Sequence, residues 1–278
     1  MGSESCISDS ARVIVRYQDI HGKKKVKKAS GLLARCIQHE TDHLTGFFLL
    51  KTPFLCTKDQ KMKNNYRIVF MGTPDFCLPA LSAMVEHGYT PVAAYTQPDK
   101  INGRGKKINY SPVKTFAMSH DIPIHQPLSF KDPSEVETLK ALKPDLLVVI
   151  AYGRILPKAV LDIPTYGAIN VHASLLPKYR GAAPIQRVII DGEKKTGVTI
   201  MQLDQGMDTG NIVETVQMDI PLHMTAGELF EALGEMGAKA LISVLEDLPE
   251  KLARSTPQEH DNATSAEKAT NEMGPIFC

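Results

Sequence analysis

The stretch DLLVVIAYG, residues Asp145–Gly153, is the most apolar strand-like segment of the chain and decides its fold class. A short apolar run bounded by turn residues is typical of a strand buried on both faces of a parallel sheet. Similar segments lie on either side of it, RIVFM at 67–71 and GAINVHAS at 167–174. Helical patterns separate these segments, and such alternation predicts an α/β fold with a mostly parallel sheet covered on both faces.

The remaining elements follow the same alternation along the chain. Ser111 before Pro112 indicates the start of one helix, and Thr225 with Glu228 three positions later indicates the start of another. Helices are predicted over 78–86, 112–119, 134–142, 183–190 and 225–248, and further strands over 90–96, 121–127, 197–204 and 211–218. Residues 97–111 are predicted to be a polar loop. In such a sheet a ligand binds at the carboxyl ends of the strands.

Composition excludes several classes of protein. The 278 residues are 43% apolar and 23% charged, which argues against a disordered chain. No segment approaches the ~20 apolar residues of a membrane span, and the first residues, MGSESCISDS, lack the features of a secretory signal. The five scattered cysteines are then expected to be reduced thiols in the cytoplasm.

The charge of the chain is divided unevenly, which suggests two units. Residues 1–65 hold 12 Lys and Arg against 6 Asp and Glu, whereas residues 66–278 hold 20 against 25. In the first unit, strands are predicted over 11–22 and 23–30, followed by a helix over 31–46. After Pro257 the chain becomes polar. We expect segments at 1–60, a linker at 61–65, a main domain at 66–257, and at 258–278 a truncated lead-in to a missing C-terminal domain.

The predicted helix of the first unit carries an HExxH pattern at His39-Glu40-Thr41-Asp42-His43. Two histidines four positions apart lie on one face of a helix and can bind one cation, while Glu40 can take a proton from metal-bound water. Cys6 is a candidate third ligand for Zn²⁺ or Fe²⁺. The alternative is a helix with two surface histidines.

The surrounding residues resemble those of peptide deformylases. CIQHETDHLTG is similar to the QHExDHLxG helix of that family, and ESCIS at 4–8 is similar to its EGCLS motif, with Ser5 in place of glycine. The resemblance implies a small α+β fragment in which Cys6, His39 and His43 are ligands and Glu40 is the general base. The family's upstream glycine-rich motif does not precede Cys6, so we expect an incomplete site that does not deformylate.

Three polar side chains are candidates for chemistry at the edge of the sheet. Asn170 and His172 are two apart on one predicted strand, so they point to the same side, and Asp208 lies between glycines on a later loop. An amide could donate to an oxyanion, an imidazole could donate or carry a proton, and a carboxylate could orient the imidazole. By spacing alone, Asn170 could instead be a turn former, His172 a core histidine and Asp208 an Asx-turn residue.

From about Tyr66 to Pro257 the chain closely resembles the N-terminal catalytic domain of methionyl-tRNA formyltransferases. The matching motifs occur in the family's order: RIVFMGTPDF, QPDK…GRGKK…SPVK, DLLVVIAYGRILP, GAINVHASLLPKYRGAAPIQ, GVTIMQLDQGMDTG and ATSAEKATNEMGPI. The resemblance implies a Rossmann-like doubly wound sheet. It also implies formyl transfer from 10-formyltetrahydrofolate to methionyl-initiator tRNA by a cytoplasmic protein, which we expect to be a monomer.

The resemblance also assigns residues. It implies that Asn170, His172 and Asp208 are catalytic and that a folate site is lined by Ser174, Leu175, Leu176 and Pro177. It implies that Arg104, Lys106 and Lys107 contact the tRNA, and a flexible cationic loop suits phosphate contact. Within the same superfamily, a small amine is the alternative acceptor. The chain could be a deliberate bifunctional fusion or two neighbouring reading frames joined near Met62, and metal-dependent hydrolysis by the first unit is the alternative activity.

Overall fold

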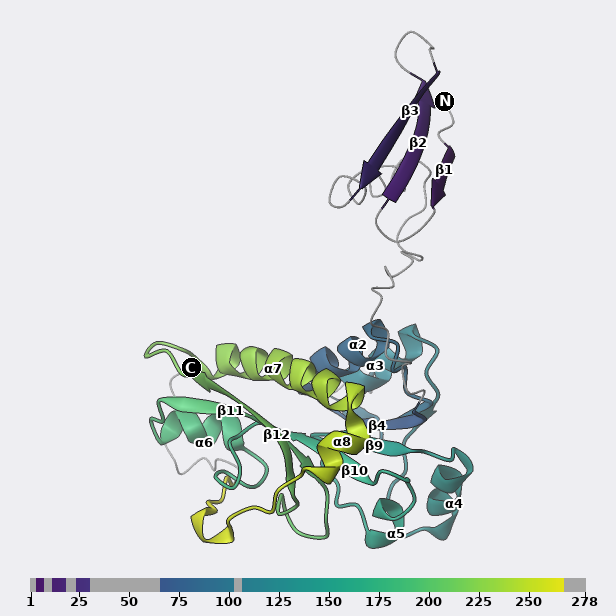
Figure 1. The fold of residues 1–278 in the computed structure, drawn as a ribbon. Coiled ribbons are helices and arrows are strands. Elements are labelled where there is room, and N and C mark those ends of the chain that lie inside the picture. Colours follow the sequence, from purple (N-terminus) through teal and green to yellow (C-terminus); the bar gives the residue numbers. More distant parts are fainter. Residues whose placement is uncertain (1–3, 8–11, 19–23, 31–65, 103–106, 268–278) are drawn as a thin grey trace. The chain divides into compact units, whose positions relative to one another are not determined.

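The computed structural model describes residues 4–7, 12–18, 24–30, 66–102 and 107–267, and the chain divides into two compact units, Met1–Lys63 and Asn64–Cys278. The first unit contains an antiparallel sheet of β1 (Glu4–Ile7), β2 (Arg12–Gln18) and β3 (Lys24–Ser30), in that order (Figure 1). Arg12 pairs with Ser30 and Gln18 with Lys24, which confirms the two strands predicted there. The helix predicted over 31–46 lies outside the described residues.

The second unit is built on a seven-stranded sheet in the order β12-β11-β10-β9-β4-β5-β8. The pairs from β10 to β8 are parallel, whereas β11 pairs antiparallel with both β10 and β12. The mostly parallel sheet that the sequence predicts is therefore confirmed. Its strands are β4 (Ile68–Gly72), β5 (Ala93–Tyr95), β8 (Ile124–His125), β9 (Leu146–Ile150), β10 (Ala168–His172), β11 (Lys195–Gln202) and β12 (Ile212–Asp219).

Helices cover both faces of this sheet. The long helix α7 runs across one face together with α2 and α3, and α4 and α5 lie on the opposite side (Figure 1). The described helices of the unit are α2 (Leu78–Glu86), α3 (Pro112–Ser119), α4 (Pro133–Ala141), α5 (Lys158–Leu161), α6 (Pro184–Ile190), α7 (Ala226–Glu246) and α8 (Leu248–Ala253). None of the helices in the described part of the chain is long and apolar enough to cross a membrane.

The alternation of side chains along the strands produces two cores. Phe70 and Val148 belong to the core that contains Leu241 of α7, and their neighbours Val69 and Leu147 belong to the core under α4. All five residues of β4 and all five of β9 are buried, as expected of strands covered on both sides. Burial of the apolar side chains of these strands therefore stabilises the packing of both helical layers on the sheet.

A glycine brings α7 close to β10. A Cβ atom on Gly237 would lie 2.8 Å from Cγ1 of Val171, a distance that real Cβ atoms do not reach. Because successive residues of a strand point to opposite faces, this contact turns Val171 toward α7 and leaves Asn170 and His172 on the other face. The packing of α7 thus decides which face of β10 is free to carry polar side chains.

The elements differ from the predictions in several places, and the short helix α5 was not predicted. The helix predicted over 225–248 ends at Glu246, and α8 begins separately at Leu248. Pro249 explains this break, since it has no amide hydrogen and its ring clashes with the carbonyl of the preceding turn. The polar loop predicted over 97–111 contains two short antiparallel strands, β6 (Lys100–Asn102) and β7 (Lys107–Asn109).

The segment after α8 packs against the sheet unit. Thr256 forms a bridge with Ile212 of β12, and Ser265 forms a bridge with Arg180 in the loop that follows β10. Gln258 is 5% exposed and Ala266 is fully buried. Residues 256–266, which are polar in sequence, therefore form part of the packed unit beside the end of β10.

Candidate active site

Two of the candidate side chains are set by β10. Asn170 pairs with Val149 of β9 and Met201 of β11, and His172 pairs with Thr199. Asn170 is thus paired on both sides and His172, the last residue of the strand, on one side. Asn170 is half-buried and His172 is 5% exposed. Both therefore stand at the end of a strand held rigidly in the interior of the sheet.

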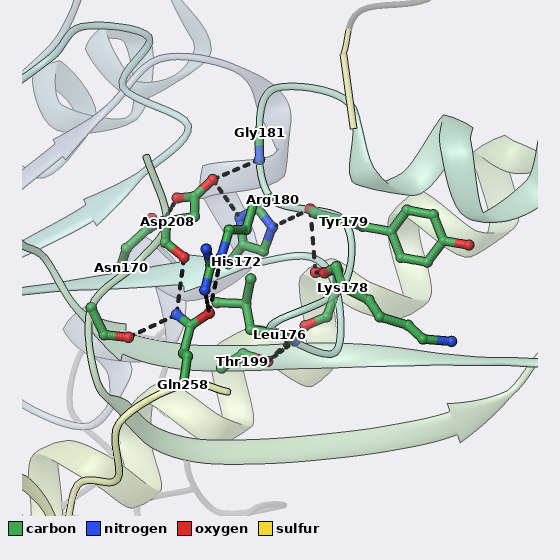
Figure 2. Close-up of polar contacts among 12 residues, drawn as sticks. Asn170, His172, Leu176, Lys178, Tyr179, Arg180, Gly181, Thr199, Asp208 and Gln258 are labelled. Carbon is green, nitrogen blue, oxygen red and sulfur yellow. Dashed lines mark hydrogen bonds and ion pairs between the residues drawn. The ribbon is translucent and has the colours of Figure 1, made fainter. Parts of the chain in front are cut away.

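The His172 ring is held in one orientation by the loop that follows it. Its Nε2 atom lies 2.8 Å from the carbonyl oxygen of Tyr179, and Figure 2 shows the ring between that carbonyl and Asp208. A carbonyl oxygen can only accept a hydrogen bond, so Nε2 must carry the hydrogen. The other ring nitrogen, Nδ1, then faces the carboxylate of Asp208 at 3.6 Å.

Asp208 is carried by a tightly closed loop between β11 and β12. A Cβ atom on Gly210 would lie 1.8 Å from the carbonyl oxygen of Gln202, so only glycine allows the two ends of the loop to approach. Asp204 accepts hydrogen bonds from the Gly206 amide at 2.9 Å and from Thr209 Oγ1 at 2.7 Å. Asp208 itself has a φ of 55° in the left-handed region, which aspartate tolerates better than most residues.

The three candidate groups meet at this point. Asn170 Nδ2 lies 3.4 Å from Asp208 Oδ1, and the amide of Gly181 donates to Asp208 Oδ2 at 2.8 Å. The side chain of Asp208 is 14% exposed, so the carboxylate sits in a weakly screened environment. The cluster therefore places an amide donor and an imidazole against one carboxylate, at the end of the strand where the sequence predicts them.

Of the four residues that the sequence predicts to line a folate site, two point inward. Ser174 is fully buried and its hydroxyl donates to the carbonyl of Lys178 at 2.7 Å, while Leu176 is 6% exposed. Thr199 Oγ1 donates to the carbonyl of Ser174 and accepts from the amide of Leu176. Ser174 and Leu176 thus shape the loop, and Leu175 and Pro177 are the two that reach a cavity.

That cavity has a volume of about 450 Å³. It is lined by Leu175, Pro177, Lys178, Tyr179, Val188, Glu193, Lys195, Thr196 and Asn262. None of these described lining residues belongs to the polar cluster of Asn170, His172 and Asp208. Figure 2 shows the Lys178 and Tyr179 side chains extending away from that cluster, so the cavity lies on the other side of the loop.

A second cavity, of about 240 Å³, opens where β4 and β5 end. Its lining residues are Thr73, Pro74, Asp75, Gln97, Pro98, Asn109, Tyr110, Ser111 and Pro112. Ends of neighbouring parallel strands are the usual position for a ligand in this class of sheet. The cavity also borders both ends of the polar loop 97–111.

A partly buried ion pair anchors that polar loop. Lys114 Nζ lies 2.5 Å from Asp99 Oδ2 and donates to Gln126 Oε1 at 2.9 Å, and its ammonium is 4.2 Å from the centre of the Tyr110 ring. Hydrogen bonds from Lys114 and then Gln126 lower the pKa of Asp99. Of the three basic residues predicted to contact tRNA, Lys107 begins β7, and Arg104 and Lys106 lie outside the described residues.

The predicted metal site falls where the side chains are not described. Cys6 lies on β1, whereas His39, Glu40 and His43 lie outside the described residues, so the metal site stays a prediction. Among the described residues no group of three or more His, Cys, Asp or Glu could hold a metal ion.

Sequence reasoning missed three groups that contact the cluster. They are the Tyr179 carbonyl, the Gly181 amide and the side chain of Gln258, which donates to the carbonyls of Asp208 and Gly210 at 2.9 and 2.7 Å. The first two are backbone atoms, to which no residue pattern points. Gln258 is 50 positions from Asp208 in a polar segment, so nothing local in the sequence distinguishes it from a surface residue.

Comparison with known proteins gives two family matches. Residues 66–245 match the formyl transferase family, and residues 4–54 match the polypeptide deformylase family. The chain is 46% identical over 210 residues to the methionyl-tRNA formyltransferase of Alkaliphilus oremlandii, and 50% identical over 210 residues to that of Acetivibrio thermocellus. Each alignment covers 76% of this chain and 68% of the relative.

Among solved structures, an N-formyltransferase from Helicobacter canadensis, in complex with folinic acid and dTDP-3-aminofucose, is similar in fold. Its TM-score is 0.56 at 20% sequence identity, with 72% of this chain and 70% of that chain covered. At this level of identity the likeness concerns the fold alone.

Proposed function

The chain belongs to the formyl transferase family, and on that premise we propose that it transfers a formyl group from 10-formyltetrahydrofolate to the amino group of methionyl-initiator tRNA. The observation that carries the proposal is the meeting of Asn170, His172 and Asp208 at the end of β10. The curated relatives, which are methionyl-tRNA formyltransferases, support the choice of acceptor.

The reaction makes definite demands on the protein. A bond forms between the amino nitrogen and the formyl carbon, and the bond between that carbon and the donor nitrogen breaks. The amino nitrogen loses a proton and the donor nitrogen gains one. Between the two steps the tetrahedral carbon carries an oxyanion, which is stabilised by preorganised hydrogen-bond donors.

Asn170 is suited to bind the oxyanion. Its side-chain nitrogen has two hydrogens, and the contact of one with Asp208 is long at 3.4 Å. The other hydrogen remains for a ligand, and the ladder on both sides of β10 holds the amide in place without reorganisation. The residue therefore supplies a fixed dipole where negative charge develops.

His172 and Asp208 are suited to move the protons. The ring nitrogens face two acceptors, the Tyr179 carbonyl and the Asp208 carboxylate, and only the doubly protonated ring can donate to both. Because the Tyr179 carbonyl holds the hydrogen on Nε2, a proton that the ring gives to the leaving nitrogen comes from Nδ1, on the side of Asp208. Asp208 stabilises the positive ring, and its carboxylate can accept a proton from the attacking amine.

Formyl transfer from 10-formyltetrahydrofolate to methionyl-tRNA tests this function directly, with His172→Ala as the control. Transfer by the wild-type chain that the control abolishes supports the proposal, and its absence in the wild type contradicts it. Offering a small primary amine in place of the tRNA separates this enzyme from formyltransferases with small acceptors. Transfer to the small amine alone would favour that alternative class.

The loop that bears Arg104, Lys106 and Lys107 is proposed to contact the phosphates of the tRNA. Each phosphate contact adds to the salt dependence of binding, since it releases condensed counterions. The measurement is tRNA affinity against salt concentration for the wild type and for the triple change to alanine. A slope unchanged by these substitutions would exclude the loop from the interface.

The match of residues 4–54 to polypeptide deformylases favours a second candidate activity, metal-dependent hydrolysis by the first unit. Cys6, His39 and His43 would hold Zn²⁺ or Fe²⁺ there, and Glu40 would act as the base. Hydrolysis of a formyl-methionyl peptide with added metal, and its loss with a chelator, would demonstrate the activity. We expect no turnover.

We also propose that the protein acts in the cytoplasm, where initiator tRNA is charged, and that it is a monomer. Sedimentation at several protein concentrations tests the second statement. A mass that rises with concentration toward twice 30.6 kDa would contradict it.

A further inference from the structure

Gln258 joins two loops that meet at the active site, although it lies in neither of them. Its Nε2 atom donates to the carbonyl of Asp208 at 2.9 Å and to that of Gly210 at 2.7 Å. Its Oε1 atom accepts from Arg180 Nε at 3.1 Å and Nη2 at 2.7 Å. All the strong hydrogen-bonding positions of the side chain are therefore used, two toward each loop (Figure 2).

These bonds close a ring of contacts around Asp208. The Asp208 side chain accepts from the amide of Gly181, which directly follows Arg180, and the Arg180 guanidinium holds Gln258. Gln258 in turn holds the main-chain carbonyl of Asp208. The carboxylate and the backbone of one residue are thus tied, by separate routes, to two neighbouring residues of the opposite loop.

The backbone of the loop with Arg180 and Gly181 is itself held by the segment that carries Gln258. The amide of Arg180 donates to the carbonyl of Thr264 at 2.8 Å, and the amide of Ala266 donates to the carbonyl of Arg180 at 2.6 Å. Tyr179, whose carbonyl orients His172, donates its amide to Thr264 Oγ1 at 2.8 Å. The segment therefore contacts the supports of both His172 and Asp208.

The conformation of Asp208 is one that the surrounding contacts help to hold. The left-handed region costs some conformational energy even for aspartate, which tolerates it better than most residues. Gln258 is 5% exposed, so its four hydrogen bonds are shielded from water, which would otherwise compete for the same groups.

We propose that Gln258 is a positioning residue that keeps the Asp208 carboxylate facing His172 by clamping the Asp208 loop to the Arg180–Gly181 loop. The effect of this clamp on catalysis rests on the proposed formyl transfer. Gln258 does not touch the reacting groups, so its removal lowers the rate of the chemical step and leaves the binding of both substrates nearly unchanged.

Two substitutions test the clamp, with a matched control. Gln258→Leu removes all four hydrogen bonds, and Gln258→Glu keeps the acceptor for Arg180 but loses the two donations to the Asp208 loop. Gln217→Glu makes the same chemical change on an exposed residue of β12. Thermal unfolding shows which variants fold, and Gln258→Glu, which has nearly the same volume, replaces Gln258→Leu if the latter does not.

Kinetics provide the first readout. We expect kcat to fall about 10- to 100-fold in both Gln258 variants, with KM for each substrate nearly unchanged, because a small displacement of a catalytic group has effects of this size. In an Asp208→Asn background, Gln258→Leu should cause little further loss, since it acts through that carboxylate. A folded Gln258→Leu enzyme with wild-type kcat, or a full additional loss in the double variant, overturns the proposal.

The second readout does not depend on activity. The Gly181 amide donates to Asp208, so its hydrogen exchange reports whether the carboxylate is in place. Exchange at Gly181, followed by NMR, should quicken about tenfold in Gln258→Leu and remain unchanged in Gln217→Glu. Equal protection in the wild type and Gln258→Leu overturns the clamp. A wild-type chain that fails to formylate but shows this difference contradicts the proposed function alone.

Discussion

The Nε2 atom of His172 lies 2.8 Å from the carbonyl oxygen of Tyr179, seven residues further along the chain, and this contact decides which ring nitrogen faces Asp208. The carbonyl holds the hydrogen on Nε2 and turns Nδ1 toward the carboxylate. The site is thus oriented by a main-chain atom on one side of the ring and by an acid on the other.

Replacing His172 should affect the chemical step. His172→Gln keeps a side chain that can donate a hydrogen bond but cannot carry a proton, and His172→Ala removes both capacities. We expect kcat to fall about 100-fold or more in each, which is the usual contribution of a positioned acid or base. Steady-state formylation measures this effect. A His172→Ala enzyme that retains full kcat would contradict the role proposed for the ring.

Replacing Asn170 should remove the oxyanion donor. We expect kcat to fall about 100- to 1,000-fold in Asn170→Ala with little change in KM, because the interaction is made mainly in the transition state. Asn170→Asp should be no better, since it places a second carboxylate against Asp208 at the 3.4 Å contact. Steady-state rates and the binding of 10-formyltetrahydrofolate, measured together, test this. A rise in KM with kcat unchanged would show that Asn170 only binds substrate.

Replacing Lys114 should weaken the binding of the tRNA acceptor and leave the rate of the chemical step unchanged. It holds Asp99 and Gln126 at the base of the loop that carries the basic residues. Lys114→Met should raise KM for tRNA about tenfold, with kcat nearly unchanged, because the loop loses a charge-assisted hydrogen bond that positions it. Lys140→Met, which breaks only an exposed pair with Glu137, is the matched control. Equal effects of the two substitutions would contradict the prediction.

The Asp99–Lys114 pair should stabilise the protein at neutral pH and not in strong acid. The pKa of Asp99 is lowered from 3.8 by hydrogen bonds from Lys114 and Gln126. A lowered folded pKa means that the stabilisation is present above the unfolded value and is lost as the pH falls through the folded value. Urea unfolding of the wild type and Asp99→Asn should differ at pH 7, and this difference should shrink as the pH falls below the ordinary value of 3.8 and through the lowered pKa of Asp99. A difference that stays the same across the acid range would contradict this origin.

Cys77 should be unreactive in the folded protein. Burial raises the pKa of its thiol to about 12, and the thiol donates to the carbonyl of Ile150 at 3.0 Å. The raised pKa leaves very little thiolate at pH 8, and the group is shielded from reagents. Peptide-resolved mass spectrometry after alkylation should find Cys77 labelled only in denaturant, and labelling under native conditions would contradict this.

Much of the fold could be predicted from local sequence signals. The helices α2 and α3 have the predicted bounds, and the Ser111 side chain accepts from the Lys114 amide as its position before Pro112 predicts. Thr225 and Glu228 form the reciprocal cap expected of their spacing. These features depend on interactions within a few residues, so the sequence contains them almost completely.

The sequence by itself determined the α/β class, the alternation of strands and helices, and the choice of Asn170, His172 and Asp208 as candidates, because apolar periodicity and motifs are local properties. Their catalytic roles stay predictions. Only the tertiary structure decided that the Asp208 loop is held by Gln258, that Gly181 donates to the carboxylate and that Tyr179 orients the ring. These contacts join distant segments, several of them through backbone atoms, and the hydrogen-bonding demand of buried groups is met only when the chain has folded.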